Sequence, residues 1–461
     1  MKTMRNKSLT SCLIAASILI TLSACTKGHQ PDMSYYRNVV SELSSPAYQG
    51  RGYAHDGVIK TSAYLQQQYR RAGVTSVETQ PFTFPVNTHG GVTELSIGNK
   101  RLVAGDEWTV REFSPAISGT FPLYILDTLT YDPARVMADL QQPEYCGAFV
   151  VCDYFQSRRF RPVITSVQRD TALASSGVIF LWEHPEQRKL AYEPYQSAGG
   201  GFDATTTLPL KYYKAESSSV RLRPDVWVRT DAFNKAIEET TSQQGLTVTI
   251  DIENHFYKNY ATENVIARVA GERHDSCYVL TAHYDHLGNL GSEVFYPGAN
   301  DNASGTAALL TLARYFSRHR PPFDILFLSV SGEDCGLYGS TYYAEHPLVP
   351  LNQVKYLINI DMIGDNNPVL YSEASDEGLE GWRRFDQLNT QHHYFQSIER
   401  GDLAANSDHY PFAMQHVPCI FFENEHGDAF PYYHTPLDDI HTICFDSALP
   451  VMQLVIDFIR N

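Results

Sequence analysis

Five residues with metal-binding side chains stand in the C-terminal half of the chain, each after an apolar run or in a tight turn. They are His283, Asp301, Asp334, Asp361 and His434. Two imidazoles and three carboxylates without a thiolate form a ligand set that suits zinc. The three carboxylates and a bridging hydroxide would balance the charge of two divalent ions. We therefore predict a site for two Zn²⁺ ions per chain.

Two further acids are candidate catalytic groups. Asp285 follows His283 by two residues, and on an extended chain the two side chains share a face. Asp285 can then accept the proton on the ring nitrogen of His283 that does not bind the metal. Glu333 stands beside Asp334 but is not itself committed to a metal, so it is placed to accept a proton from an attacking water. The chemistry predicted is hydrolysis by a metal-activated water.

Apolar runs and helical patterns alternate from residue 256 to the end of the chain, and these elements must position the candidate ligands. The expected strands are Cys277–Ala282, Ile325–Val330, Tyr356–Ile360 and Cys419–Phe422, and the expected helices are Ala303–Arg318 and Ser447–Arg460. This alternation predicts an α/β fold with a mostly parallel mixed sheet flanked by helices. Because ligands bind beyond the carboxyl ends of strands in such sheets, we expect His283, Glu333 and Asp361 at one edge.

The catalytic domain is expected to combine residues 34–110 with residues 256–461. The N-terminal part contains a helical pattern over Val58–Ala72, followed by Gly73 in the position typical of a helix C-terminus.

Residues 111–255 differ in texture and are expected to form an inserted β-rich domain. Gly147–Cys152 and Gly177–Trp182 are short β-like segments, and the joints between such segments are rich in proline and glycine. The run Gly199–Gly201 is predicted to be a loop. The stretch is similar in texture to a protease-associated domain.

The chemical motifs together resemble the co-catalytic di-zinc exopeptidases, the family of secreted bacterial leucyl-type aminopeptidases and glutamate carboxypeptidases. The matching residues are His283-x-Asp285, Asp301 within GANDNASG, Glu333-Asp334, Asp361 within NIDMIG, Ser407–Phe412 (SDHYPF) and Tyr433-His434. The motifs occur in the order typical of the family.

The resemblance implies a role for each of these residues. Asp301 would bridge the two ions, His283 and Asp361 would complete one metal position, and Asp334 and His434 would complete the other. The resemblance also implies that Asp285 orients His283, that Glu333 is the general base, that Tyr433 stabilises the oxyanion, and that the peptide bond after Asp301 is cis. One departure is that the family usually has two glutamates where this chain has Glu333-Asp334. The shorter Asp334 leaves the metal affinity of its position open.

The predicted activity is that of a metal-dependent exopeptidase, an aminopeptidase that acts on peptide or protein N-termini. A carboxypeptidase of the same family would instead need a cation, preferably arginine, for the terminal carboxylate of its substrate. The motif segments contain no arginine, although Arg383, Arg384 or Arg400 could reach the site from a loop. The motifs also leave open a single-zinc enzyme like glutaminyl-peptide cyclotransferase and a non-catalytic binding module.

Charge and the N-terminal segment limit the partners and the location. The chain has 36 Lys and Arg against 52 Asp and Glu, and its net charge of −16 disfavours nucleic-acid binding. Lys2, Arg5 and Lys7 precede the apolar stretch Leu13–Leu22, so residues 1–24 are predicted to be a signal peptide.

The signal peptide ends in a sequence that resembles the bacterial lipoprotein box. In the tetrapeptide Leu22-Ser23-Ala24-Cys25, Cys25 would become the lipidated first residue, and residues 25–33 would serve as a lipidated tether. We therefore expect an exported lipoprotein that is anchored to a membrane and faces the periplasm or the outer-membrane or cell surface.

Overall fold

Two eight-stranded sheets organise the protein. The structure is a computed structural model, and it describes residues 30–126, 132–154, 157–169, 176–182, 220–240, 245–424 and 430–461. The expected signal peptide, Cys25 and Gly199–Gly201 lie outside the described residues. Within the described part of the chain, no helix is both long enough and apolar enough to cross a membrane.

The first sheet is mixed and has a parallel centre. Its strands, in spatial order, are β1 (Ser76–Thr88), β10 (His255–Val269), β14 (Phe323–Val330), β11 (Arg273–His283), β15 (Val354–Ile360), β18 (Cys419–Glu423), β16 (Val369–Ala374) and β17 (Ser397–Arg400). The strands β14, β11, β15 and β18 are mutually parallel, whereas β1, β10 and β16 join by antiparallel pairing. The predicted mostly parallel mixed sheet is confirmed.

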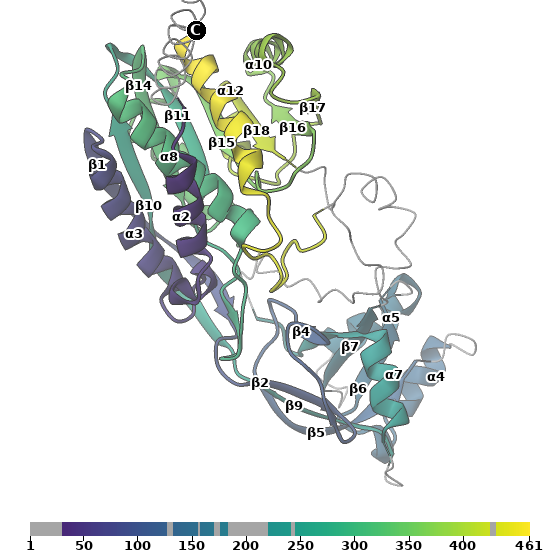
Figure 1. The fold of residues 1–461 in the computed structure, drawn as a ribbon. Helices are drawn as coiled ribbons and strands as arrows, with labels where there is room; N and C mark the ends of the chain where they lie inside the picture. Colours follow the sequence, from purple (N-terminus) through teal and green to yellow (C-terminus); the bar gives the residue numbers. More distant parts are fainter. Residues whose placement is uncertain are drawn as a thin grey trace, which may run out of the picture.

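Helices cover both faces of this sheet. The helices α2 (Met33–Leu43), α3 (Gly57–Ala72), α8 (Gly305–Arg318), α10 (Leu379–His392) and α12 (Ala448–Arg460) pack on one face, and α9 (Tyr338–Glu345) and α11 (Tyr410–Ala413) pack on the other. In Figure 1, α2, α3, α8 and α12 lie together in front of the strands. Alternate residues of β11 enter the two cores, since Leu280 packs on the first face and Val279 on the second. Burial on both faces explains why the central strands are continuous apolar runs.

The expected elements of this part are confirmed with small shifts at their ends. β11, β14, β15 and β18 contain the four predicted strands, and α8 and α12 begin within two residues of the predicted helices. The helix α3 ends at Ala72, and Gly73 follows it with a φ of 81°, as its predicted position at the C-terminus requires.

The second sheet contains strands from a longer segment than the sequence suggested. In spatial order the strands are β3 (Lys100–Arg101), β2 (Thr93–Ile97), β9 (Thr247–Ile252), β5 (Ile117–Ile125), β6 (Phe149–Asp153), β7 (Gly177–Trp182), β8 (Asp225–Arg229) and β4 (Trp108–Val110). The helices α4 (Pro133–Asp139), α5 (Ser157–Arg169) and α7 (Thr230–Glu238) accompany it.

The expected domain boundary at residue 111 falls inside this second sheet. Thr93 in β2 pairs with Ile252 in β9, and Trp108 in β4 pairs with Val228 in β8. Strands before residue 111 therefore belong to the insertion, because their pairing partners are near its far end. Such long-range pairing leaves no local sequence signal in strands of two to five residues.

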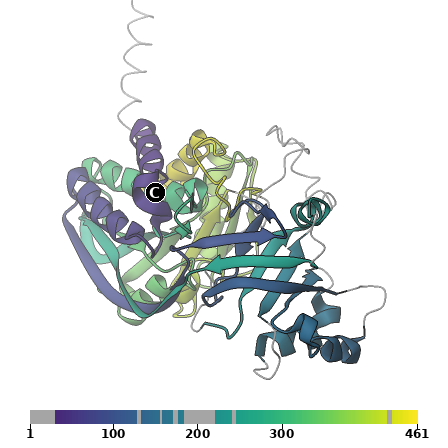
Figure 2. The same cartoon turned by 90° about the horizontal axis from the view of Figure 1, so that it is seen from below.

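The insertion packs against the loop that follows β11. Leu287, Leu290 and Tyr296 of this loop are buried in the same core as Trp108 of the second sheet. The turn at Gly105 lies so close to Pro436 that an added Cβ atom would be 3.3 Å from the Cγ atom of Pro436. Figure 2 shows the second sheet beside the helix-covered sheet. The insertion thus supports loops that carry candidate metal ligands.

Candidate metal centre

The carboxyl ends of three adjacent parallel strands bring candidate residues together. His283 is the last residue of β11, Asp361 directly follows β15, and Glu333 and Asp334 follow β14, which ends at Val330. β11 lies between β14 and β15 in the sheet. The expected grouping of these residues at one edge agrees with this topology.

Asp301 is held in a rigid turn between β13 (Val294–Phe295) and α8. The peptide bond from Asp301 to Asn302 is cis, as the resemblance implied. On one side, Asp438 accepts hydrogen bonds from the backbone N–H groups of Asn300 and Asp301, at 2.7 and 3.0 Å. Burial raises the pKa of Asp438 to about 7, although these two hydrogen bonds lower it.

Arg51 holds the same turn through its carbonyl groups. Its guanidinium is fully buried and donates to the carbonyl oxygens of Gly298 (2.9 Å), Asp301 (2.8 Å) and Pro297 (2.6 Å). The same side chain donates to the carbonyl of Tyr284, which lies between His283 and Asp285. Arg51 therefore ties the Asp301 turn to the end of β11, and it places a positive charge next to a group of buried acids.

The five predicted ligands form two groups that share Asp301. The Nε2 atom of His283 lies 3.2 Å from Asp301 Oδ1 and 3.3 Å from Asp361 Oδ1. The Nε2 atom of His434 lies 3.0 Å from Asp301 Oδ2 and 3.2 Å from Asp334 Oδ1. All five residues are buried. Each oxygen of Asp301 therefore faces a different imidazole, which is the arrangement of a bridging carboxylate.

These donor atoms fit zinc in type and spacing. Donors arranged tetrahedrally at about 2.0–2.1 Å from a zinc ion are about 3.3 Å from one another. The separations of 3.0–3.3 Å between the nitrogen and oxygen atoms are close to this value. Asp301 Oδ2 and Asp361 Oδ1 are buried and receive no well-directed hydrogen bond from the described residues. Buried carboxylates require such a partner or a cation, so the residues present fit zinc.

The carboxylate of Asp285 does not make the expected hydrogen bond to His283. The Nδ1 atom of His283 lies 3.3 Å from the backbone carbonyl of Asp285 and 3.8 Å from its Oδ1 atom. The reason is that β11 ends at His283, so the two side chains do not share a face of one extended strand. Instead, Asp285 accepts hydrogen bonds from the Tyr53 hydroxyl at 2.6 Å and from the Glu333 N–H at 3.4 Å.

Glu333 lies beside the first group of ligands. Its Oε2 atom is 3.9 Å from His283 Nε2, and its side chain is 11% exposed. Burial raises the pKa of the Glu333 carboxyl well above its usual range; His283 lowers this pKa, and Asp334 and Asp408 raise it further. Glu333 is therefore the acid of this site that combines partial exposure with a strong tendency to hold a proton.

Tyr433 lies next to the second group of ligands. Its ring stacks on that of His434, with 3.7 Å between the centroids and 21° between the planes. Tyr433 is half-buried. The residue predicted to stabilise the oxyanion therefore lies beside the candidate ligand His434.

Several residues of the site had no role assigned from the sequence. They are Arg51, Tyr53, His286, Ser407 and Asp438. Arg51 lies in the Gln49–Gly52 segment, far from the ligands along the chain. His286 belongs to the same run as His283 and Asp285, and this spacing was the one signal that could have suggested a role for it.

Residues 264–459 match the family model described as peptidase family M28. The match covers 196 of the 461 residues of the chain. The M28 segment contains all five candidate ligands and Glu333, whereas Arg51 and Tyr53 come from outside it.

Curated relatives align with part of the chain. A probable zinc metalloprotease of Pyrenophora tritici-repentis (strain Pt-1C-BFP) is 42% identical over 106 residues, which is 22% of each chain. Aminopeptidase YwaD of Bacillus subtilis (strain 168) is 29% identical over 200 residues, which is 41% of this chain and 42% of YwaD. The chain therefore matches less than half the length of either relative.

Solved structures resemble nearly the whole chain, including the inserted domain with the second sheet. BSAP, a zinc aminopeptidase from Bacillus subtilis, has a TM-score of 0.64 at 20% identity and covers 94% of this chain and 96% of its own. The aminopeptidase from Aneurinibacillus sp. strain AM-1 has a TM-score of 0.58 at 20% identity, covering 94% of each chain. At this identity the comparison establishes a shared fold.

Proposed function

We propose that this protein is a zinc-dependent aminopeptidase that holds two Zn²⁺ ions and hydrolyses the N-terminal peptide bond of peptides or proteins. The observation that carries the proposal is the position of Asp301, whose two oxygens face His283 and His434 separately at 3.2 and 3.0 Å. Asp361 would complete the first metal position and Asp334 the second. The match of residues 264–459 to family M28 supports this function, as do the names of two relatives, a probable zinc metalloprotease and an aminopeptidase.

Glu333 would move the proton during hydrolysis. It lies beside His283 and Asp361, but Asp301 already completes three ligands at that position, so we assign the Glu333 carboxylate to the attacking water. The group accepts the proton of the water and delivers it to the nitrogen of the leaving amine. When bound, the two zinc ions would polarise the scissile carbonyl and lower the pKa of water.

Other residues of the chain would orient these groups. The contact of Asp285 with the Glu333 backbone holds the segment that presents the base. The Tyr433 hydroxyl would donate to the oxyanion that forms from the substrate carbonyl. The stacking of Tyr433 on His434 restricts where that hydroxyl can lie.

The charges at the site favour recognition of a substrate ammonium group. Glu333, Asp361 and Asp408 place three acidic side chains there, and Asp408 is fully buried beside Ser407, which donates to Asp361 at 2.7 Å. A free N-terminal amine is cationic and would be attracted to this group of acids.

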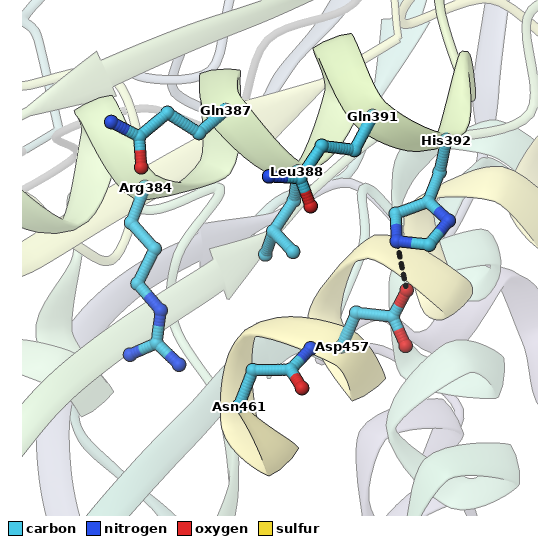
Figure 3. A pocket seen from close by; sticks show the side chains of 7 residues that line it. All are labelled: Arg384, Gln387, Leu388, Gln391, His392, Asp457 and Asn461. Carbon is cyan, nitrogen blue, oxygen red and sulfur yellow. Dashed lines mark ion pairs between the residues drawn. The ribbon is translucent and has the colours of Figure 1, made fainter.

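Two of the three arginines considered for a carboxypeptidase, Arg384 and Arg400, are engaged elsewhere. Arg384 lines a hollow between α10 and α12 (Figure 3), and its guanidinium lies 4.8 Å from the ring of Phe458. That hollow includes Asp457 near the C-terminus of α12 and Asn461, which follows the helix. The opposite end of α12 follows Ser447, whose hydroxyl donates to the carbonyl of Ile363 near the metal centre. Arg400 is exposed and lies over Trp382, with 5.9 Å to the ring centroid.

A set of matched peptides tests the direction of cleavage. One peptide has free ends, one is N-acetylated, and one has an amidated C-terminus. We expect acetylation to abolish cleavage and amidation to leave the rate nearly unchanged, with release of the first amino acid followed by mass spectrometry. Cleavage that survives acetylation but is lost on amidation would contradict the aminopeptidase and support a carboxypeptidase.

We also propose that the protein is exported and anchored to a membrane through lipid on Cys25, facing the periplasm or the cell surface. The basis is the apolar segment and the sequence Leu22-Ser23-Ala24-Cys25. Mass spectrometry of the N-terminal peptide tests this, since an unmodified Cys25 in a membrane fraction would contradict it.

A further inference from the structure

Asp361 and Asp334 each belong to only one of the two ligand groups, and their carboxylates are held in the same way. Asp361 turns Oδ1 toward His283 at 3.3 Å, and its Oδ2 accepts a hydrogen bond from the Ser407 hydroxyl at 2.7 Å. Asp334 turns Oδ1 toward His434 at 3.2 Å, and its Oδ2 lies 3.0 Å from the Nδ1 atom of His286. In both cases one oxygen faces an imidazole ligand and the other is taken by a side chain outside the ligand set.

His286 is enclosed so that its ring has little freedom to move. The residue is fully buried, and its backbone N–H donates to the carbonyl of Arg51 at 3.3 Å. A Cβ atom added to Gly298 would lie 2.4 Å from His286 Cδ2, so the ring packs directly on the turn that carries Asp301. The ring also meets that of His434 edge-on, at 5.8 Å between the centroids.

The hydrogen bond between His286 and Asp334 has a defined direction. An ionised carboxylate can only accept, so Nδ1 of His286 carries the proton and donates it to Oδ2. The terminal torsion of an aspartate is soft and has broad minima. Without a donor on Oδ2, the carboxylate of Asp334 could rotate and turn Oδ1 away from His434. A short side chain such as aspartate cannot compensate by bending elsewhere.

We propose that His286 is a positioning residue that fixes Asp334 as a one-oxygen ligand of the second zinc position. Ser407 acts in the same way on Asp361 at the first position. This inference rests on the two-zinc centre of the proposed function. The affinity of the second position for zinc thus depends on a residue that is not itself a ligand.

A pair of polar variants tests the role of the Nδ1 proton. In His286→Asn the side-chain amide nitrogen is bonded to Cγ, as Nδ1 is in histidine, so the donor to Asp334 is retained. In His286→Gln the amide is one bond further from the backbone, and the donor moves to the place of Nε2. We expect the glutamine variant to bind the second zinc ion about 10–100-fold more weakly and the asparagine variant to stay close to wild type.

The readout is zinc binding rather than activity. Zinc equivalents are measured by inductively coupled plasma mass spectrometry after dialysis against zinc buffers, and the ions are located by anomalous scattering in crystals. The ion beside His434 should be the one lost from His286→Gln. In Ser407→Ala, the ion beside His283 should be weakened instead, which serves as the matched control at the other position.

A rescue experiment separates positioning from a general loss of structure. Asp334→Glu introduced into the His286→Gln variant adds a methylene, so the carboxylate can reach the ion without the histidine, and zinc affinity should recover at least in part. The inference is overturned if His286→Gln retains the second ion with wild-type affinity, if the glutamate gives no recovery, or if an ion is found bonded to Nδ1 of His286. A wild-type protein that binds fewer than two zinc ions would instead contradict the proposed function, before any variant is compared.

Discussion

Replacing Glu333 by glutamine should lower kcat by ~10²–10⁴ while the zinc content stays unchanged. The amide has the shape of the carboxylate but cannot accept the proton of the attacking water. Glu333 is not among the residues assigned to either metal position, and its Oε2 atom lies 3.9 Å from the Nε2 atom of His283. Its removal should therefore affect proton transfer far more than metal binding. Steady-state kinetics with a free-amine peptide and zinc analysis of the same preparation check both parts.

Glu345 offers a control for this substitution. It is an exposed glutamate at the end of α9, away from the strand ends that carry the ligands. Glu345→Gln should leave both kcat and the zinc content at wild-type values. If Glu333→Gln loses a zinc ion, Glu333 is a ligand and the general base must be another group.

Replacing Asp301 by asparagine should weaken zinc binding at both positions. Each oxygen of Asp301 faces one imidazole, at 3.2 Å for His283 and 3.0 Å for His434. The amide removes a negative charge shared by two ions and turns an NH₂ group toward one of them. We expect a loss at each position that exceeds the roughly 10–100-fold typical of losing an outer hydrogen-bond partner. Activity should fall with zinc occupancy.

Asp361→Asn provides the comparison, because the Asp361 carboxylate faces only one of the two ligand imidazoles, that of His283. That variant should weaken one position and leave the ion beside His434 in place. Titration of the metal-free protein with zinc, followed by calorimetry, distinguishes the two patterns. A wild-type titration with one tight ion and no second binding event would contradict the two-zinc centre and would favour a single-zinc enzyme of the cyclotransferase type.

Much of the catalytic part of the fold could be predicted from local patterns. The central strands are buried on both faces, so their sequences are continuous apolar runs, and polar residues follow at their ends. Because the carboxyl ends of parallel strands meet at one edge, residues as distant in sequence as His283 and Asp361 could be grouped from the pattern of strands alone. The turn containing Asp301 was also recognisable, since its glycines and asparagines directly precede an apolar helix.

Other features were decided by tertiary structure alone. The insertion begins before the expected boundary, because β2 and β4 pair with strands more than 100 residues later, and strands this short have no periodicity of their own. Arg51 reaches the Asp301 turn from the N-terminal segment, and nothing in its local sequence indicates five backbone acceptors at that place.

The orientation of the acidic side chains at the metal centre was likewise decided by tertiary structure. The sequence by itself determined which side chains can bind a metal, because that property belongs to the residue type and to its place at the end of a strand. Only the folded chain decided which oxygen of each carboxylate faces an imidazole and which is held by Ser407 or His286. These choices depend on rotations of single bonds within a packed interior, and such rotations are set by neighbours that lie far away along the chain.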